Sequence, residues 1–260
     1  MDLNLNDKVF IVTGGAKGIG AAISKSLAAE GAIVVVAGRG KEVNQKMVDE
    51  IHLAHGKACY HTVELSTAEA CKELIEFTIE KYGRIDGLVN NAGVNDGVDL
   101  ENGSPEKFLA SIQKNLSHVY NLSHYALPYL KLTKGTIINI GSKVAETGQG
   151  HTSGYAASKG GINALTREFA AELLPYSIRV NTVIPAEVWT PLYASWIQTL
   201  PNPEEKLADI VSKIPLEKRF TTAEEIADMA VFLASSRSSH TTGQIIYVDG
   251  GYTHLDRSLT

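Results

Sequence analysis

The segment that decides the fold of this 260-residue chain is Lys8-Val-Phe-Ile-Val-Thr13-Gly14-Gly-Ala-Lys-Gly18-Ile-Gly20. Its first six residues are a short, largely apolar and β-branched run, as expected for a strand buried on both faces of a parallel sheet. Glycines follow at once, and a helical pattern then runs from Ile19 to Ala29. Such a turn lets the backbone approach a diphosphate, which the free N–H groups and the helix dipole then hold. The spacing Gly-x-x-x-Gly-x-Gly is not the commoner dinucleotide pattern and lacks the ending of a P-loop.

The same alternation of strand and helix continues along the chain. We expect further strands at 33–38, 58–63, 87–90, 136–140, 178–184 and 244–248, and helices at 42–55, 67–82, 105–130, 153–174 and 222–234. This order predicts one α/β domain over residues 1–260, a Rossmann-type, doubly wound parallel sheet of about seven strands with helices on both faces. A proline-broken excursion, residues 186–220, is expected to stand above the sheet as a substrate lid.

Composition narrows the class of protein. The apolar content of 44% and charged content of 20% are ordinary for a globular protein. A net charge of -5 argues against nucleic acid or an anionic membrane as the main partner. The two cysteines, Cys59 and Cys71, have no metal-like spacing, so we expect no metal and a reducing compartment. Without a secretion signal or a membrane-length apolar run, we expect a cytoplasmic protein.

Candidate chemistry lies in the stretch from Ser142 to Lys159. Tyr155 and Lys159 are four residues apart, so on a helix they share one face. A free phenol with a pKa near 10 is a poor base, and lowering that pKa by about three units requires roughly 4 kcal/mol of phenolate stabilisation. A nearby ammonium can supply it, and the hydroxyl of Ser142 can bond a substrate oxygen. These residue types suit proton transfer at an alcohol or carbonyl oxygen.

The end of the second expected strand bears on the cofactor. Dinucleotide folds place a carboxylate there to bind the ribose 2′-OH, whereas arginine suits a 2′-phosphate. In this chain Gly38 takes the place of the acid, Arg39 follows, and Lys17 lies in the glycine turn. Two cations and no acid favour NADP, with NAD as second choice. The alternative is that both cations are solvated surface charges.

Several of these features share one edge of the expected sheet. The glycine turn, Arg39, Asn90, Ser142 and Pro185 all follow strands, and ligands of such sheets bind outside the carboxyl ends of the strands. Asn115 lies inside an apolar helical stretch, so it is either a structural bridge or part of a polar relay.

Taken together, these residues resemble the single-domain short-chain dehydrogenase/reductase family over almost the whole chain. The landmarks appear in order: Thr13-Gly-x-x-x-Gly-x-Gly20, Asn90-Asn-Ala-Gly93, Asn115, Ser142, Tyr155-x-x-x-Lys159, Pro185 and Asp249-Gly-Gly251. Two positions depart from the family pattern. Ala186 stands where glycine usually follows the proline, and Glu64 stands where the adenine-side acid is usually Asp.

The resemblance implies a homotetramer and the roles of the site residues. Tyr155 would be the general acid/base, Lys159 would lower its pKa and bind the nicotinamide ribose, and Ser142 would orient the substrate oxygen. Asn115 would anchor a water in a proton relay. The cofactor contacts implied, besides Tyr155 and Lys159, are Gly14, Lys17, Gly18, Ile19, Gly20, Arg39, Glu64, Leu65, Asn91, Ala92, Gly93, Val188 and Thr190.

Four stretches, residues 91–97, 147–155, 185–193 and 248–256, are similar to the bacterial L-fucose dehydrogenases of this family. We therefore expect oxidation at C1 of L-fucose or a related aldose, giving the lactone. Polar residues on strand-end loops would bind the hydroxyls beside Ser142 and Tyr155, namely Asn95, Asp96, Gln149, His151 and Glu187. Aromatic residues of the excursion would cover the apolar face of the sugar: Trp189, Tyr193 and Trp196.

Two alternatives remain open. One is a reductase of 3-oxoacyl thioesters or other small carbonyl compounds, for which the excursion would need a basic patch to dock an acidic carrier. The other is a dinucleotide-binding sensor without catalysis, whose mark would be a broken Ser/Tyr/Lys set, whereas this set is whole. His118 and His124 lack metal-ligand company and are expected to be structural or interface residues.

Overall fold

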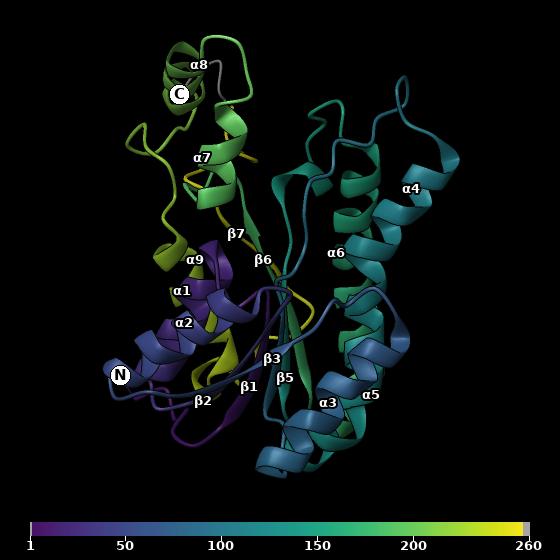
Figure 1. Cartoon of the computed structure of the whole chain (residues 1–260), viewed down its shortest axis with the longest axis vertical. Helices are drawn as coiled ribbons and strands as arrows, with labels where there is room; N and C mark the ends of the chain where they lie inside the picture. Colours follow the sequence, from purple (N-terminus) through teal and green to yellow (C-terminus); the bar gives the residue numbers. More distant parts are fainter. Residues whose placement is uncertain (1, 257–260) are drawn as a thin grey trace.

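The computed structural model describes residues 2–256, in which strands and helices alternate as the sequence predicts (Figure 1). Its parallel sheet has the order β3-β2-β1-β4-β5-β6-β7. The strands are β1 (Val9–Thr13), β2 (Ile33–Gly38), β3 (Lys57–Thr62), β4 (Gly87–Asn90), β5 (Thr136–Ile140), β6 (Arg179–Pro185) and β7 (Ile245–Val248). Strand order reverses between β1 and β4, which is where such sheets bind ligands. The predicted fold class is confirmed.

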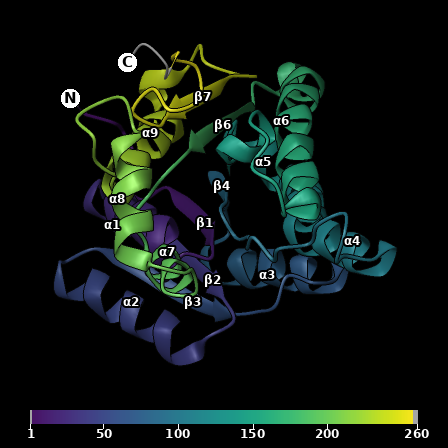
Figure 2. The same cartoon turned by 90° about the horizontal axis from the view of Figure 1, so that it is seen from above.

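Helices cover both faces of the sheet, as Figure 2 shows. On one face pack α1 (Gly18–Ala29), α2 (Lys41–Leu53) and α9 (Ala223–Ala234), and on the other α3 (Ala68–Tyr82), α5 (His118–Thr133) and α6 (Ser153–Leu173). Each layer buries an apolar core, with Leu27 and Val231 in the first and Leu74 and Leu122 in the second. Every residue of β1 and β5 is buried, because both faces of these central strands are covered.

The long helix expected over residues 105–130 is wrong as one continuous α-helix. It divides into α4 (Pro105–Ile112), a π-helical turn η1 (Gln113–Ser117) and α5. Asn115 lies in this turn, where its Nδ2 donates to the Ser111 carbonyl at 3.1 Å and its Oδ1 accepts from Val94 N at 2.8 Å. The wider turn accompanies these bonds, which tie the helix to the chain beyond β4. π-helical turns of this kind are frequent at functional sites.

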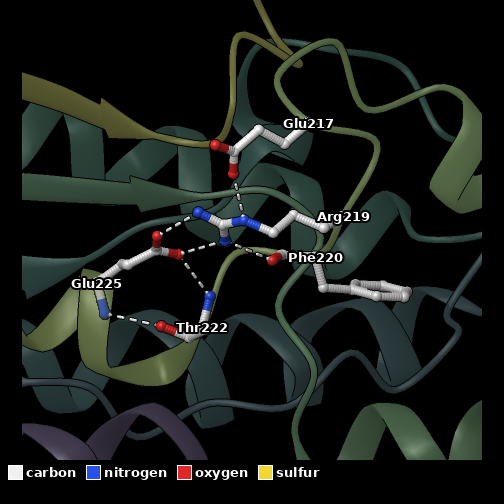
Figure 3. Close-up of polar contacts among 5 residues, drawn as sticks. All are labelled: Glu217, Arg219, Phe220, Thr222 and Glu225. Atoms are coloured by element: carbon white, nitrogen blue, oxygen red, sulfur yellow. Dashed lines mark hydrogen bonds and ion pairs between the residues drawn. The ribbon is translucent and has the colours of Figure 1, made fainter.

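The excursion forms α7 (Pro191–Ile197) and α8 (Pro203–Ser212), which stand beyond the carboxyl ends of the strands (Figure 1). The C-terminal end of the excursion is fixed to α9 by Arg219, as Figure 3 shows. The guanidinium bonds both carboxylate oxygens of Glu225, at 3.0 and 2.6 Å, and Glu217 at 2.7 Å. Glu225 in turn completes a capping box with Thr222 at the start of α9. Arg219 thus anchors the C-terminal end of the excursion.

No helix of residues 2–256 is both long and apolar enough to cross a bilayer. Both cysteines, Cys59 in β3 and Cys71 in α3, are buried free thiols.

Candidate functional site

A cavity of about 700 Å³ opens at the carboxyl ends of the strands and runs from the glycine turn to Tyr155. It gathers residues from widely separated parts of the chain. Among the expected cofactor and catalytic residues, its lining includes Gly14, Lys17, Gly18, Ile19, Arg39, Glu64, Leu65, Asn91, Ala92, Gly93, Ser142, Tyr155, Lys159, Val188 and Thr190. A volume of this size is in the range of small-molecule and cofactor sites.

The glycine turn has the geometry of an anion site. Helix α1 begins at Gly18 with no side-chain cap and no acidic residue in its first turn, so its first N–H groups are left for a ligand. Gly20 does not line the cavity but packs beneath it. A Cβ at that position would lie 2.3 Å from the Gly14 carbonyl oxygen and 2.5 Å from Asn91 Nδ2, so only glycine fits. These residues fit the diphosphate of a dinucleotide.

The loop after β4 is hydrogen bonded to the end of β1. Thr13 Oγ1 accepts from Asn91 N and Ala92 N, both at 3.0 Å, and donates to Val89 O at 3.2 Å. The Asn91 side chain donates back to Thr13 O at 2.8 Å. Backbone and small side chains therefore fix one wall of the cavity without any charged group. The sequence analysis used Thr13 as the end of a strand and as a family landmark but gave it no role, so this positioning role was missed.

Arg39 and Lys17 both line the cavity, at the end where we expect the adenosine of the cofactor. The expectation that no acid opposes Arg39 is wrong, because Glu64 Oε2 lies 3.5 Å from Arg39 Nε. The parallel pairing of β2 with β3 brings the residues after the two strands together. Both side chains are largely exposed, so this ion pair is weak and a ligand phosphate can compete for the guanidinium.

Tyr155, Ser142 and Lys159 meet at the other end of the cavity. Tyr155 is hydrogen bonded with Ser142, and Lys159 Nζ donates to the Ile140 carbonyl at 2.7 Å. Burial raises the pKa of Tyr155 to about 12 against the effect of the Ser142 bond, and burial lowers the pKa of Lys159 to about 8. In the chain by itself the pKa of Tyr155 is therefore raised, because the cost of burying the phenolate exceeds the opposing effect of the Ser142 bond.

Asn115 lies at the back of the same group of residues. Gly93 separates it from Lys159: a Cβ on Gly93 would lie 3.2 Å from Asn115 Oδ1 and 3.6 Å from Lys159 Nζ. The carboxamide is buried and bonded to Val94 N and Ser111 O. The structure shows Asn115 as a structural bridge, and its part in a polar relay stays a prediction.

A buried series of hydrogen-bonded polar side chains holds α6, and with it Tyr155 and Lys159, against the sheet. Asn90 Nδ2 donates to Asn139 Oδ1 at 2.9 Å, and Asn139 Nδ2 donates to Thr166 Oγ1 at 2.9 Å. Thr166 Oγ1 also lies 2.6 Å from Thr182 Oγ1. Asn90, Asn139 and Thr182 are register neighbours on β4, β5 and β6, so this series ties three strands to one helix. Removing a member would leave a buried polar group unpaired.

Of the expected substrate residues, Tyr193 lines the cavity together with Ser142 and Tyr155. Glu187 is buried just beyond β6 and does not itself line the cavity, and its carboxylate is paired with Lys143. Lys143 was missed by sequence reasoning, although its place directly after Ser142 was a usable signal. Trp189 and Trp196 do not line the cavity. They remain 46% and 41% exposed and pack on Tyr193, with ring centroids 5.9 and 5.1 Å away.

The other polar residues expected around the substrate are not in the cavity lining. His151 is an exposed loop residue whose Nδ1 lies 2.9 Å from Asp99 Oδ2, a contact that lowers the pKa of Asp99 to about 2. Asp96 accepts from Ser111 Oγ at 2.8 Å, Asn95 caps its own turn through Gly97 N, and Gln149 is exposed. Asn95, Asp96 and His151 thus have hydrogen-bond partners outside the cavity: the first in its own turn, the second on α4 and the third in the loop after β4.

Of the two histidines expected to be structural, His118 is buried and contributes to the lining of the cavity, whereas His124 is exposed on α5. His118 is buried in α5, and burial together with the positive charge of Lys159 lowers its pKa to about 4. His124 stacks on Tyr120 with ring centroids 6.0 Å apart.

An uncapped helix start after a glycine turn, a cavity of about 700 Å³ and a Ser/Tyr/Lys group at its end are the features of one class of protein, the NAD(P)-dependent dehydrogenases and reductases. Comparison with known proteins supports this class. A family model described as enoyl-(acyl carrier protein) reductase matches residues 14–253. This chain belongs to the short-chain dehydrogenase/reductase family, and it is an oxidoreductase.

Three similar proteins cover nearly the whole chain. The 3-oxoacyl-(acyl-carrier-protein) reductase FabG of Thermotoga maritima is 38% identical over 96% of this chain and 99% of its own. The L-fucose dehydrogenase of Bos taurus is 34% identical over 94% of this chain and 88% of its own. The crystal structure of Cj0485 dehydrogenase is 45% identical, with a TM-score of 0.94 over 100% of this chain and 99% of that one. These likenesses establish the family but leave two substrate classes.

Proposed function

We propose that this chain is an NADP-preferring dehydrogenase that oxidises L-fucose, or a closely related aldose, at C1 to the lactone. The observation that carries the proposal is the buried Lys143–Glu187 ion pair beside Ser142. A polyhydroxylated ring has several hydroxyls that lose water on binding, and each one left unpaired costs about 1–3 kcal/mol. A charged pair can bond such hydroxyls, whereas it would cost binding energy beside an acyl chain.

The catalytic roles follow from where the side chains lie. Ser142 would hold the C1 hydroxyl, and Tyr155 would take its proton as the hydride leaves C1. The bound nicotinamide supplies the hydride acceptor. Lys159, behind Tyr155 and next to Gly93, would bind the ribose and stabilise the phenolate, and Asn115 would connect this group to solvent through a water. The products are the lactone, the reduced cofactor and one proton.

The cofactor end supports a preference for NADP. Arg39 and Lys17 both border the cavity, and the Arg39–Glu64 contact is an exposed pair that a doubly charged phosphate can replace. We further propose that the excursion is the substrate lid, since Tyr193 and Leu192 of α7 line the cavity. From the family we propose a homotetramer, and we propose that the protein is cytoplasmic.

Reduction of 3-oxoacyl thioesters is the second candidate, favoured by the 38% identity to FabG. The excursion argues against it. Lys206 and Lys213 both pair with Asp209, and Arg219 pairs with Glu217 and Glu225. These cations are neutralised by their neighbours, so they offer little attraction to an acidic carrier protein.

The test is turnover of the purified protein, followed at the nicotinamide absorbance band. L-Fucose and a panel of aldoses are assayed with NADP⁺ and NAD⁺, and a 3-oxoacyl thioester is assayed with NADPH. We expect kcat/KM for L-fucose or a related aldose to exceed that of the thioester at least tenfold. A thioester or a lipophilic alcohol turned over far better than every aldose would refute the sugar assignment.

A further inference from the structure

Two charged side chains are buried together next to residues that line the cavity, although neither of the two lines it itself. Lys143 opens the short turn η2 (Lys143–Ala145) directly after Ser142, and Glu187 follows Ala186 just beyond β6. Lys143 Nζ donates to Glu187 Oε1, and the side chains retain only 11% and 9% of their exposure. Their sequence neighbours, Ser142 and Ala186, both line the cavity. The pair is therefore adjacent to the expected reaction centre.

Structural stability alone does not account for this pair. Removing two charges from water costs several kcal/mol each, and well-packed apolar residues often hold two loops as well or better. The two cores of this protein are held together in that way, because they are built largely from aliphatic side chains. A buried ion pair at the ligand edge of the sheet is instead the kind of group that marks a binding function.

Tyr193, which lines the cavity, connects the pair to it, and each member of the pair can form further hydrogen bonds. Lys143 Nζ lies 4.2 Å from the centre of the Tyr252 ring, which supports the ammonium by a cation–π contact. The Tyr193 hydroxyl is buried beside the Glu187 carboxylate, whose charge adds to burial in raising the pKa of Tyr193, so this hydroxyl stays protonated. An ammonium has three donors and a carboxylate accepts up to four hydrogen bonds, so one mutual bond does not exhaust either.

Resting on the function proposed above, we propose that Lys143 and Glu187 act together as the specificity-determining pair of the substrate site. The Glu187 carboxylate accepts from one sugar hydroxyl, and the Lys143 ammonium donates to a neighbouring one. Because the two charges cancel, the pair favours a neutral polyol over a charged substrate such as a sugar acid. Lys143 thereby has a role in substrate choice and none in proton transfer.

The test uses three variants that keep side-chain volume: Lys143→Met, Glu187→Gln and the double Lys143→Met/Glu187→Gln. Each is assayed with L-fucose and with analogues that lack one hydroxyl at a time, and NADP⁺ affinity and melting temperature are measured alongside. We expect each single variant to lose about 10- to 100-fold in kcat/KM for L-fucose, mainly through KM, with NADP⁺ affinity unchanged. The loss should shrink for the analogue that lacks the recognised hydroxyl.

The double variant separates recognition from a structural role. It leaves no lone buried charge, so it should fold even where a single variant does not, and it should keep the high KM for L-fucose. Restoration of the L-fucose KM in the double variant, or equal losses with every analogue, would overturn the proposal. Lys206→Met, an exposed lysine of α8, is the matched control and should change nothing. If the unmodified protein oxidised no aldose, the function itself would be wrong and this proposal would fall with it.

Discussion

The two ends of the cavity are held by different kinds of contact. At the cofactor end, Thr13 bonds the backbone of Asn91 and Ala92, and Gly20 lets the glycine turn approach the same loop. The buried series of polar side chains from Asn90 to Thr182 fixes α6 behind it. At the substrate end, α8 has no buried residue, and Trp189 and Trp196 are nearly half exposed.

This difference separates the contacts that dinucleotide binding requires throughout the family from the side chains that determine the substrate of an individual enzyme. Binding a dinucleotide requires backbone N–H groups, glycines and small polar side chains in set positions, so the sequence pattern and the structure coincide there. Substrate choice depends on a few side chains of the excursion and of the turn after β5, and the backbone permits many others. The comparison predicts that changes at the two ends will affect different measured quantities.

The largest effect should come from the phenol at the junction of the two ends. Tyr155→Phe removes the group proposed to accept the proton while keeping the ring, so kcat should fall by roughly 10²- to 10⁴-fold. NADP⁺ affinity, measured by fluorescence titration, should stay within about twofold, because the cofactor end is held by other residues. Tyr176→Phe, on the exposed turn η3 (Leu174–Tyr176), is the control. Near-normal turnover of Tyr155→Phe would show that the proton-transfer role is wrong.

A second prediction concerns pH and the buried His118 beneath the cofactor end. Its pKa of about 4 lies below the ordinary value of 6.5, so between those pH values the unfolded chain binds more protons than the folded one. The stability that neutral His118 provides is fully present above pH 6.5 and is lost as the pH falls toward 4. The shift corresponds to at most about 3 kcal/mol.

Urea unfolding at a series of pH values, comparing the wild type with His118→Leu, measures this loss. The free energy of unfolding of the wild type should fall more steeply between pH 6.5 and 4 than that of the variant. His124→Leu, on the same helix, should keep the wild-type slope. Parallel curves for wild type and His118→Leu would contradict the account of His118 as a histidine kept neutral by burial.

The smallest effect is expected at the exposed adenosine end. Arg39→Ala removes a cation that pairs only weakly with Glu64, so the KM for NADP⁺ should rise about tenfold while the KM for NAD⁺ changes little. Lys46→Ala, on the exposed side of α2, controls for the loss of one positive charge. Equal changes in both cofactor KM values would remove the basis for an NADP preference.

Much of the molecule was predictable because local rules and the global fold agree. The β-branched runs, the Gly14–Gly20 turn and the Tyr155–Lys159 spacing each follow from strand burial, anion binding or helix periodicity, and the structure brings all of them to one edge of the sheet. The π-helical turn at Asn115 was not predictable from periodicity, because it depends on a tertiary bond to Val94.

The substrate end was predicted less well, because its side chains also depend on tertiary contacts. Asn95, Asp96 and His151 are polar loop residues like those that bind ligands, yet they bond to Gly97, Ser111 and Asp99. Conversely, the burial of Lys143 was not predicted, because a lysine in a loop is usually solvated, and only its place directly after Ser142 pointed to the site. Its partner Glu187 is 44 residues away, and only the pairing of β5 with β6 brings them together.

The most direct test of the central claim follows the hydrogen at C1. L-Fucose carrying deuterium at C1 is incubated with the protein and NADP⁺, and the reduced cofactor and the sugar product are examined by NMR and mass spectrometry. The account predicts deuterium on the nicotinamide ring and a lactone, formed stoichiometrically. Reduced cofactor without deuterium, or reduction of a 3-oxoacyl thioester under conditions where no aldose is oxidised, would contradict it.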